Sequence, residues 1–353
     1  SGADATENGT QSVTITITDN ESAPTVTLAV SATSIAENAG SSLTLTATLS
    51  GATDADITVA LDTAGTATEG TDYGNLSDIT ISAGATTGTV SFTPTNDSIY
   101  DATSNETATI SINGVSGKTG VAENSTPQAV TITITDDESA PTVTLTSNSY
   151  TMAEDAGGYH TIRASLSVAT YEDVTVSIDG TGGTATEGTD FGTVSDITIS
   201  AGNTLGTTTF TATDDNVYEG NETAGISVSG VSGGGASENG SQAFTITITE
   251  NESAPTVTLS TSGSSIAENA GSSLTLTATL SVATTADVTV ALSTSGTATE
   301  GTDYTDGSGA IDDITISAGS TTGTVNFTPT NDSVYEGDET ATIAISSVSG
   351  GSA

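Results

Sequence analysis

The sequence contains no cysteine and no tryptophan, and its 353 residues include two basic side chains, Lys118 and Arg163. The lack of cysteine excludes disulfides, and with a single histidine it makes zinc and copper sites poor fits. The 44 Asp and Glu residues give a formal net charge of −42, which excludes nucleic acid as a partner because nothing could neutralise its phosphates. No apolar run approaches the roughly 20 residues of a membrane-spanning helix, so we expect no membrane insertion.

What the sequence does contain is one pattern written three times. The hexapeptide Ala-Pro-Thr-Val-Thr-Leu occurs at residues 23–28, 140–145 and 254–259. A spacing of about 115 residues is too long for a solenoid repeat and fits one whole small domain per copy. We therefore expect three domains, at residues 23–139, 140–253 and 254–353.

Each copy shows the two-residue periodicity of β-strands and no helical periodicity. In the first copy, Val, Leu and Ile alternate with Thr and Ser in seven segments, at residues 25–30, 43–49, 56–62, 79–81, 90–92, 108–112 and 130–134. Turn residues separate these segments, which predicts an all-β protein of seven-stranded, antiparallel, immunoglobulin-like sandwiches. The connections between copies are short and contain proline, so we expect the domains to lie end to end as a rod.

Acidic residues follow alternate predicted strands. In the first copy Glu37, Asp72, Asp97 and Asp136 follow the first, third, fifth and seventh strands. Odd-numbered strands of an up-and-down path end at the same pole, so these carboxylates should converge there. Converging carboxylates repel one another unless a hard cation lies among them, and Ca²⁺ takes 6–8 oxygen ligands in irregular loops. The alternative is a solvated, salt-tolerant pole without an ion.

The order of these motifs resembles that of the Calx-β domain, known from sodium–calcium exchangers and large bacterial surface adhesins. The matching motifs are Ala-Glu-Asn-Ala-Gly, Gly-Thr-Asp-Tyr, Asn-Asp-Ser-Val-Tyr-Glu-Gly-Asp-Glu-Thr and Ile-Thr-Ile-Thr-Asp-Asp-Glu. The resemblance covers all three copies, and it implies a seven-stranded sandwich that binds calcium in the loops at one pole.

The resemblance also implies a set of calcium ligands for each copy. These are Glu37, Asp72, Asp97, Asp136 and Asp137 in the first copy, Glu154, Asp190, Asp214, Asp215, Glu250 and Glu252 in the second, and Glu268, Asp303, Asp332 and Glu336 in the third. The second copy ends in Glu-Asn-Glu where the first has Asp-Asp-Glu, which is expected to weaken its site. The acidic loop of the first copy is longer than that of the third and is expected to lie differently.

The third copy stops before its last predicted strand, whereas residues 1–22 contain a last strand without a domain. Residues 11–18 align with residues 128–135. The chain is either a window on a longer array, a piece cut without regard to domains, or a subunit that donates this strand to a neighbour. Donation would use Gln11, Val13, Ile15 and Ile17 as the subunit-contact strand and would bring Asp19 and Glu21 to the third calcium site of the neighbour. A heterologous contact of this kind builds an open head-to-tail filament.

We therefore expect an extracellular structural protein, a calcium-stiffened rod or filament that extends from cells or links them. Its partners would be calcium and copies of itself or further repeats. The alternatives are the stalk or ligand-binding region of an adhesin that recognises a polysaccharide or a partner cell, and a calcium-sensing regulatory segment. We expect no enzyme, because the single histidine, His160, occupies an inward strand position that is leucine in the other copies.

Overall fold

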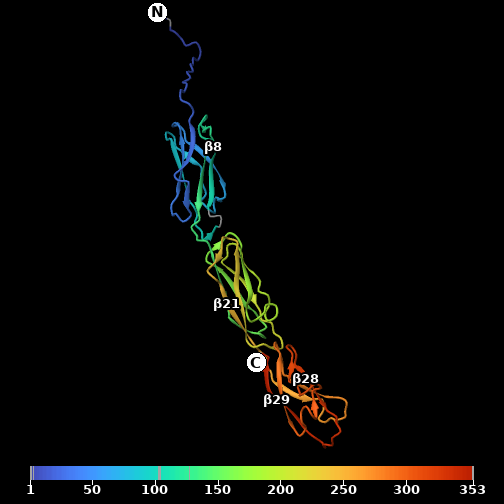
Figure 1. The fold of residues 1–353 in the computed structure, drawn as a ribbon. Helices are drawn as coiled ribbons and strands as arrows, with labels where there is room; N and C mark the ends of the chain where they lie inside the picture. The colour runs from blue at the N-terminus through green and yellow to red at the C-terminus, as the bar shows by residue number, and fades with distance from the viewer. Residues whose placement is uncertain (1, 3, 102–104, 127, 352–353) are drawn as a thin grey trace. The chain divides into compact units, whose positions relative to one another are not determined.

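The computed structural model describes residues 2, 4–101, 105–126 and 128–351, and every element in them is a β-strand (Figure 1). The prediction of tandem all-β sandwiches is confirmed. The chain divides into two compact units, residues 1–139 and residues 140–353. Within the described part of the chain, no helix has the length and apolarity required to cross a membrane.

The first unit contains one sandwich of two sheets. The four-stranded sheet has the order β6 (Thr87–Phe92), β3 (Leu43–Leu49), β1 (Thr25–Val30), β9 (Ala122–Glu123). The five-stranded sheet has the order β2 (Ser34–Ala36), β10 (Ala129–Thr135), β8 (Asn105–Ser116), β4 (Ile57–Gly65), β5 (Ile79–Ile81). A further short strand, β7 (Ile99–Tyr100), lies in the acidic loop. The seven predicted segments correspond to β1, β3, β4, β5, β6, β8 and β10.

The sandwich departs from the predicted antiparallel pattern at two short added strands. β2 pairs parallel with β10, and β9 pairs parallel with β1. The reason for the first is the path of the chain. β2 follows β1 closely, crosses to the opposite sheet in the same direction, and meets the last strand there. Three residues of Ser, Ile and Ala carry too little periodicity to be recognised as a strand from sequence.

The core of each domain lies between the two sheets and is closed by a pair of stacked aromatic rings. In the first domain Tyr73 stacks on Phe92 with ring centroids 4.7 Å apart. The corresponding distances are 5.1 Å for Phe191 and Phe210 and 4.6 Å for Tyr304 and Phe327. The recurring Gly-Thr-Asp-Tyr/Phe motif thus supplies an aromatic ring to the core as well as an acidic residue to the surface.

The second domain, at the start of the second unit, repeats this topology. Its four-stranded sheet has the order β17 (Leu205–Phe210), β13 (His160–Leu166), β11 (Thr142–Ser147), β20 (Ser237–Glu238). Its five-stranded sheet has the order β12 (Thr151–Ala153), β21 (Ala243–Thr249), β19 (Glu222–Ser232), β15 (Val174–Gly183), β16 (Ile197–Ile199). β14 (Ala169–Thr170) and β18 (Val217–Tyr218) lie in loops. His160 has a structural role, since its Nε2 lies 2.8 Å from the carbonyl oxygen of Thr151.

Within the described residues the third domain has a four-stranded and a three-stranded sheet, without counterparts of β2, β9 and β10. The four-stranded sheet has the order β22 (Val257–Thr261), β23 (Leu274–Leu280), β28 (Thr322–Pro329), β26 (Tyr304–Thr305), in which β26 is added beside β28. The incomplete sheet has the order β27 (Ile314–Ile316), β25 (Val288–Gly296), β29 (Ala341–Gly350), and β24 (Ala283–Thr284) lies in a loop. Within the described residues nothing pairs with the second edge of β29. Residues 265–267, the counterpart of β2 and β12, form no strand because the strand that would pair with them is missing.

The missing strands leave the core of the third domain open. Ile110 and Ile226 are fully buried in the first two domains, whereas their counterpart Ile343 is only partly buried. A cavity of about 1110 Å³ lies beside it, lined among others by Ile266, Leu276, Phe327 and Ile343.

The segment before β1 forms no strand in this chain. Val13, Ile15 and Ile17 are 88%, 82% and 93% exposed, and Figure 1 draws the segment as a coil outside the first sandwich. Its apolar side chains alternate as in a strand, but among the described residues it pairs with no strand of the first unit.

Candidate metal centre

Carboxylates gather in two kinds of cluster, each made of three side chains with oxygens within 4.8 Å of one another. We call the first kind the strand-end cluster: Glu37, Asp137 and Glu138 in the first domain, and Glu154, Glu250 and Glu252 in the second. We call the second kind the loop cluster: Asp190, Glu219 and Glu222 in the second domain, and Asp303, Glu336 and Glu339 in the third.

The parallel strand pair explains the strand-end cluster. Parallel strands end at the same edge of a sheet, so β12 and β21 bring Glu154 beside the acids that follow Thr249. The amide of Glu154 donates a hydrogen bond to the carbonyl of Thr249 (3.1 Å). In the first domain the amide of Glu37 donates in the same way to Thr135 (3.0 Å). The third domain has the first of these acids, Glu268, but lacks the strand that would supply the others.

The carboxylate of Glu250, which directly follows β21, also accepts hydrogen bonds from the acidic loop. The amides of Glu219 and Gly220, which directly follow β18, donate to Glu250 Oε2 at 2.6 and 2.8 Å. The amides of Asn251 and Glu252 donate to its other oxygen, both at 3.0 Å. Burial alone would raise the pKa of Glu250, but its hydrogen bonds outweigh burial and hold the pKa below its usual value. Glu250 therefore stays ionised and links the strand-end cluster to the loop cluster.

Three other carboxyls in the clusters of the second domain are less readily ionised than usual. Burial, reinforced by the charges of Glu250 and Asp190, raises the pKa of Glu154, Glu219 and Glu222 to about 7. The only ion pair among the described residues joins Lys118 to Asp54 and involves none of these groups. A cation among these carboxylates would favour their ionised forms and so offset the effect of burial.

The first domain shows the same electrostatics. Burial and the charges of Asp72 and Asp101 raise the pKa of Glu106 to about 7. The hydrogen bond with Asp136, followed by burial, raises the pKa of Glu138 to about 7. Glu106 therefore lies beside Asp72, as its counterpart Glu222 lies beside Asp190 in the second domain.

The donor set of the strand-end cluster fits a calcium ion. The Oε2 atoms of Glu138 and Glu252 are buried and have no hydrogen-bond partner among the described residues. A buried carboxylate oxygen without a partner costs free energy, and a hard cation would remove that cost. The cluster offers oxygen atoms alone, which suits Ca²⁺ rather than zinc or copper.

Some predicted ligands instead shape the loops. The Oδ1 atoms of Asp97, Asp215 and Asp332 accept the amide two residues further on, each at 2.7 Å. These aspartates belong to none of the four clusters of three. Asp214 accepts a hydrogen bond from the Asn251 side-chain amide (2.9 Å).

The aspartates of the Gly-Thr-Asp motif have two roles. Asp72, Asp190 and Asp303 accept the backbone amide four residues earlier, at 2.5 to 2.6 Å, and so close the turn. Asp190 and Asp303 also belong to loop clusters. Asp136 accepts the amide of Asp101 at 3.1 Å, as Glu250 accepts that of Glu219.

The two acids of the N-terminal segment lie in none of the clusters. The amide of Glu21 donates to Asp19 Oδ1 (3.2 Å), and neither side chain belongs to a cluster of three. Glu268 likewise has no cluster in this chain and accepts the amide of Asp332 (2.7 Å).

Five acids that the structure places in these clusters or beside them are absent from the predicted ligand sets. They are Glu106, Glu138, Glu219, Glu222 and Glu339. A signal existed for three of them: Glu-Thr-Ala begins the strand after the acidic loop in every copy, at Glu106, Glu222 and Glu339. Their recurrence at the same position in each copy was a signal of a shared role. Their place at the start of a strand, however, is also typical of solvent-exposed acids.

Comparison with known proteins gives one family and several solved structures. The family model of the Calx-beta domain matches residues 19–138, 136–252 and 250–353. CBD12 from CALX1.2 is 18% identical, with a TM-score of 0.26, over 56% of this chain and 77% of that chain. Invasin, a bacterial integrin-binding protein, is 13% identical, with a TM-score of 0.31, over 90% of this chain and 56% of that chain. No curated protein matches the chain.

Proposed function

The chain belongs to the Calx-beta domain family, and from that premise we propose that it is an extracellular structural protein, a rod or filament stiffened by calcium. The domains we propose are residues 23–139, 140–253 and 254–353. Their role is to extend from cells or to link them. Calcium neutralises the carboxylates at the acidic poles. An ion bound by both the acidic loop and the strand-end cluster limits how one domain rotates relative to the next.

The observation that carries the calcium proposal is the pair of buried carboxylate oxygens without partners, on Glu138 and Glu252. Both lie in strand-end clusters that contain no cation from the chain itself. Glu37, Asp137 and Glu138 would hold the ion in the first domain, and Glu154, Glu250 and Glu252 would hold it in the second. In the second domain the loop cluster would support the ion indirectly, because the loop that carries Glu219 donates two amide hydrogen bonds to Glu250.

Glu252→Gln tests this assignment. A ligand present at about one hundred times its dissociation constant stabilises the folded state by about 2.7 kcal/mol. We therefore expect calcium to raise the melting temperature of the unsubstituted chain over its value in chelator, and Glu252→Gln to reduce this rise. Asp62→Asn, at an exposed site outside the clusters, is the matched control. Equal melting temperatures with calcium and with chelator would refute calcium binding.

We also propose that the chain polymerises by donating residues 11–18 to the third domain of a second copy. Residues 11–18 differ from residues 128–135 only by Ser12 in place of Ala129. Within the described residues the third domain has no counterpart of this strand, and an open cavity lies where its side chains would be.

The pairing of β10 with β8 and β2 predicts the register of the donated strand. Val13 would lie opposite Ile343 and Ile15 opposite Ala341, in an antiparallel pair. Ile17 would lie beside Ile266 in a parallel pair. The donated strand would then bring Asp19 and Glu21 to Glu268 and complete a strand-end cluster in the third domain.

A further inference from the structure

The second and third domains, which belong to one unit, are joined by a short parallel strand pair as well as by the chain. β18 pairs with β24, with Val217 opposite Ala283 and Tyr218 opposite Thr284. The pair buries Ala283 and Thr284, which are 9% and 1% exposed. A loop of one domain therefore docks on a loop of the next through backbone pairing.

The third domain carries the counterpart of this docking loop, which pairs with no strand among the described residues. Val334 and Tyr335 are the counterparts of Val217 and Tyr218, and they are 62% and 97% exposed. They form no strand, whereas Val217 and Tyr218 are strand residues that are partly buried. The two side chains that pack at the joint in the second domain are therefore both exposed in the third.

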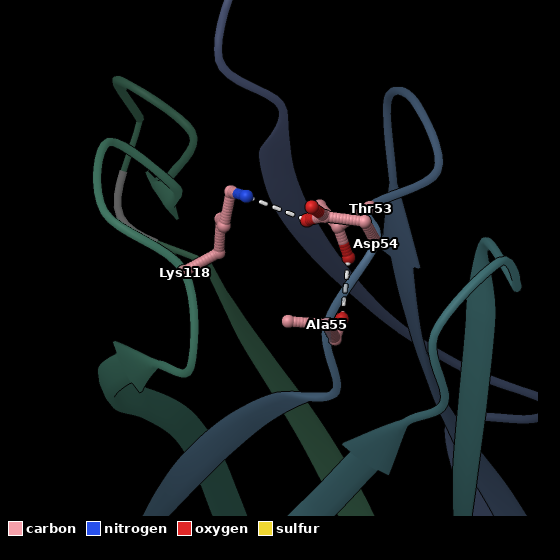
Figure 2. A network of polar contacts seen from close by, with 4 residues as sticks. All are labelled: Thr53, Asp54, Ala55 and Lys118. Carbon is pink, nitrogen blue, oxygen red and sulfur yellow. Dashed lines mark hydrogen bonds and ion pairs between the residues drawn. The ribbon is translucent and has the colours of Figure 1, made fainter. Parts of the chain in front are cut away.

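The first domain carries the matching receptor loop. Thr53 donates its hydroxyl hydrogen to the carbonyl of Ala55 (2.7 Å), as Figure 2 shows, and its own carbonyl accepts the amide of Gly84 (2.8 Å). Beside it, Lys118 forms an ion pair with Asp54 (2.6 Å; Figure 2).

The receptor loop of the third domain is held in the same way. Thr284 donates to the carbonyl of Ala286 (2.8 Å), and its carbonyl accepts the amide of Gly319 (2.8 Å). The receptor loop of the first domain therefore has the same internal hydrogen bonds as the receptor loop that is paired in the third domain. Ala52, however, is exposed where Ala283 is buried.

A donated strand would bring these two loops together. The connector that follows β21, residues 249–257, differs from residues 18–26 only by Glu250 in place of Asp19. Suppose that residues 11–18 of a donor copy lie in the third domain of an acceptor copy. Residues 18–26 would then connect the acceptor's third domain to the donor's first domain, just as residues 249–257 connect the second domain to the third within one chain. Asp19 would then accept the amides of Glu336 and Gly337, as Glu250 accepts those of Glu219 and Gly220.

We propose that Val334 and Tyr335 of one copy form a parallel strand pair with Ala52 and Thr53 of a second copy. This interface rests on the proposed strand donation and adds a second contact to it. One contact alone would leave the connector free to bend, whereas two contacts set the direction in which the next copy extends. The joint between copies is therefore built like the joint between the second and third domains.

Disulfide trapping tests the interface directly, because the chain contains no cysteine of its own. The test variant carries Val334→Cys and Ala52→Cys, the counterparts of the paired Val217 and Ala283. The positive control carries Val217→Cys and Ala283→Cys and should form a disulfide within one chain. The mismatched control carries Val334→Cys and Ser41→Cys, since Ser41 lies in another exposed loop.

After oxidation with diamide, we expect the test variant to form a ladder of covalent oligomers in denaturing gels. Pairing raises the local thiol concentration, so cross-linking should be on the order of tenfold faster than in the mismatched control. Deleting residues 1–22 from the test variant should abolish the ladder.

Sedimentation of the reduced protein separates the two proposals. Polymers that sediment but cross-link no faster than the mismatched control would overturn the loop interface and leave strand donation standing. A chain that remains monomeric at all concentrations would overturn both.

Discussion

Replacing Ile15 by alanine should weaken self-association strongly while leaving the folded monomer intact. Ile15 is 82% exposed in the single chain, so its loss removes no core contact there. Its counterparts Ile132 and Ile246 are both fully buried. If strand donation is correct, Ile15 moves from water to an equally buried position in the neighbour.

The size of the effect follows from that burial. Truncating a buried isoleucine to alanine costs about 2–5 kcal/mol. Taking about 3 kcal/mol, association should weaken by roughly a hundredfold, since each 1.4 kcal/mol is tenfold. This loss falls wholly on the joint between copies.

Sedimentation velocity over a range of concentrations would measure the effect. Thr14→Ala is the matched control, because its counterpart Thr131 faces solvent in β10. We expect Thr14→Ala to polymerise like the unsubstituted chain. Equal polymerisation of Ile15→Ala and the unsubstituted chain, with equal melting temperatures, would refute the reasoning.

Two further predictions concern the single chain. In chelator, stability should fall as the pH rises from about 5 through about 7, because the folded state keeps protons on Glu154, Glu219 and Glu222 that the unfolded chain releases near its ordinary pKa. Saturating calcium should flatten this slope in thermal melts recorded from pH 5 to 8, and a stability that instead rises with pH in chelator would contradict the assigned pKa shifts. Gly183→Ala should destabilise the second domain by several kcal/mol in urea titrations, because Gly183 has φ +100° and an added Cβ would lie 2.0 Å from the Thr223 carbonyl oxygen; Gly202→Ala, with φ +75° but no neighbouring atom within 4 Å, separates the clash from the backbone strain.

The main strands could be predicted because alternation is a local property. Val26 and Leu28, like Leu45 and Leu49, are buried as their spacing predicts. A sheet buried on one face requires an apolar side chain at every second residue, and the sequence records this requirement directly. The short parallel strands could not be predicted, because two or three residues hold no period and their pairing depends on a partner far away in the sequence.

For the candidate site, the acids that follow strands could be predicted, but their grouping could not. Glu37 and Asp137 meet only because β2 lies beside β10. Asp97 was predicted as a ligand, but in this structure its carboxylate caps its own loop, and Glu106, which was not predicted, faces the charge of Asp72. Side chains in loops obey no period, so the local sequence does not indicate which of them converge.

The sequence by itself determined the repeat, the all-β class, the excess of negative charge and the unmatched strand at residues 11–18, since each of these is written in local composition or in self-similarity. Only the tertiary structure decided that the acids form two linked clusters and that β18 pairs with β24 across a domain boundary. It also decided that the same loops, at Val334 and Ala52, lie exposed in the last and first domains. These features depend on contacts between residues distant in the chain, and such contacts exist only after the sheets have formed.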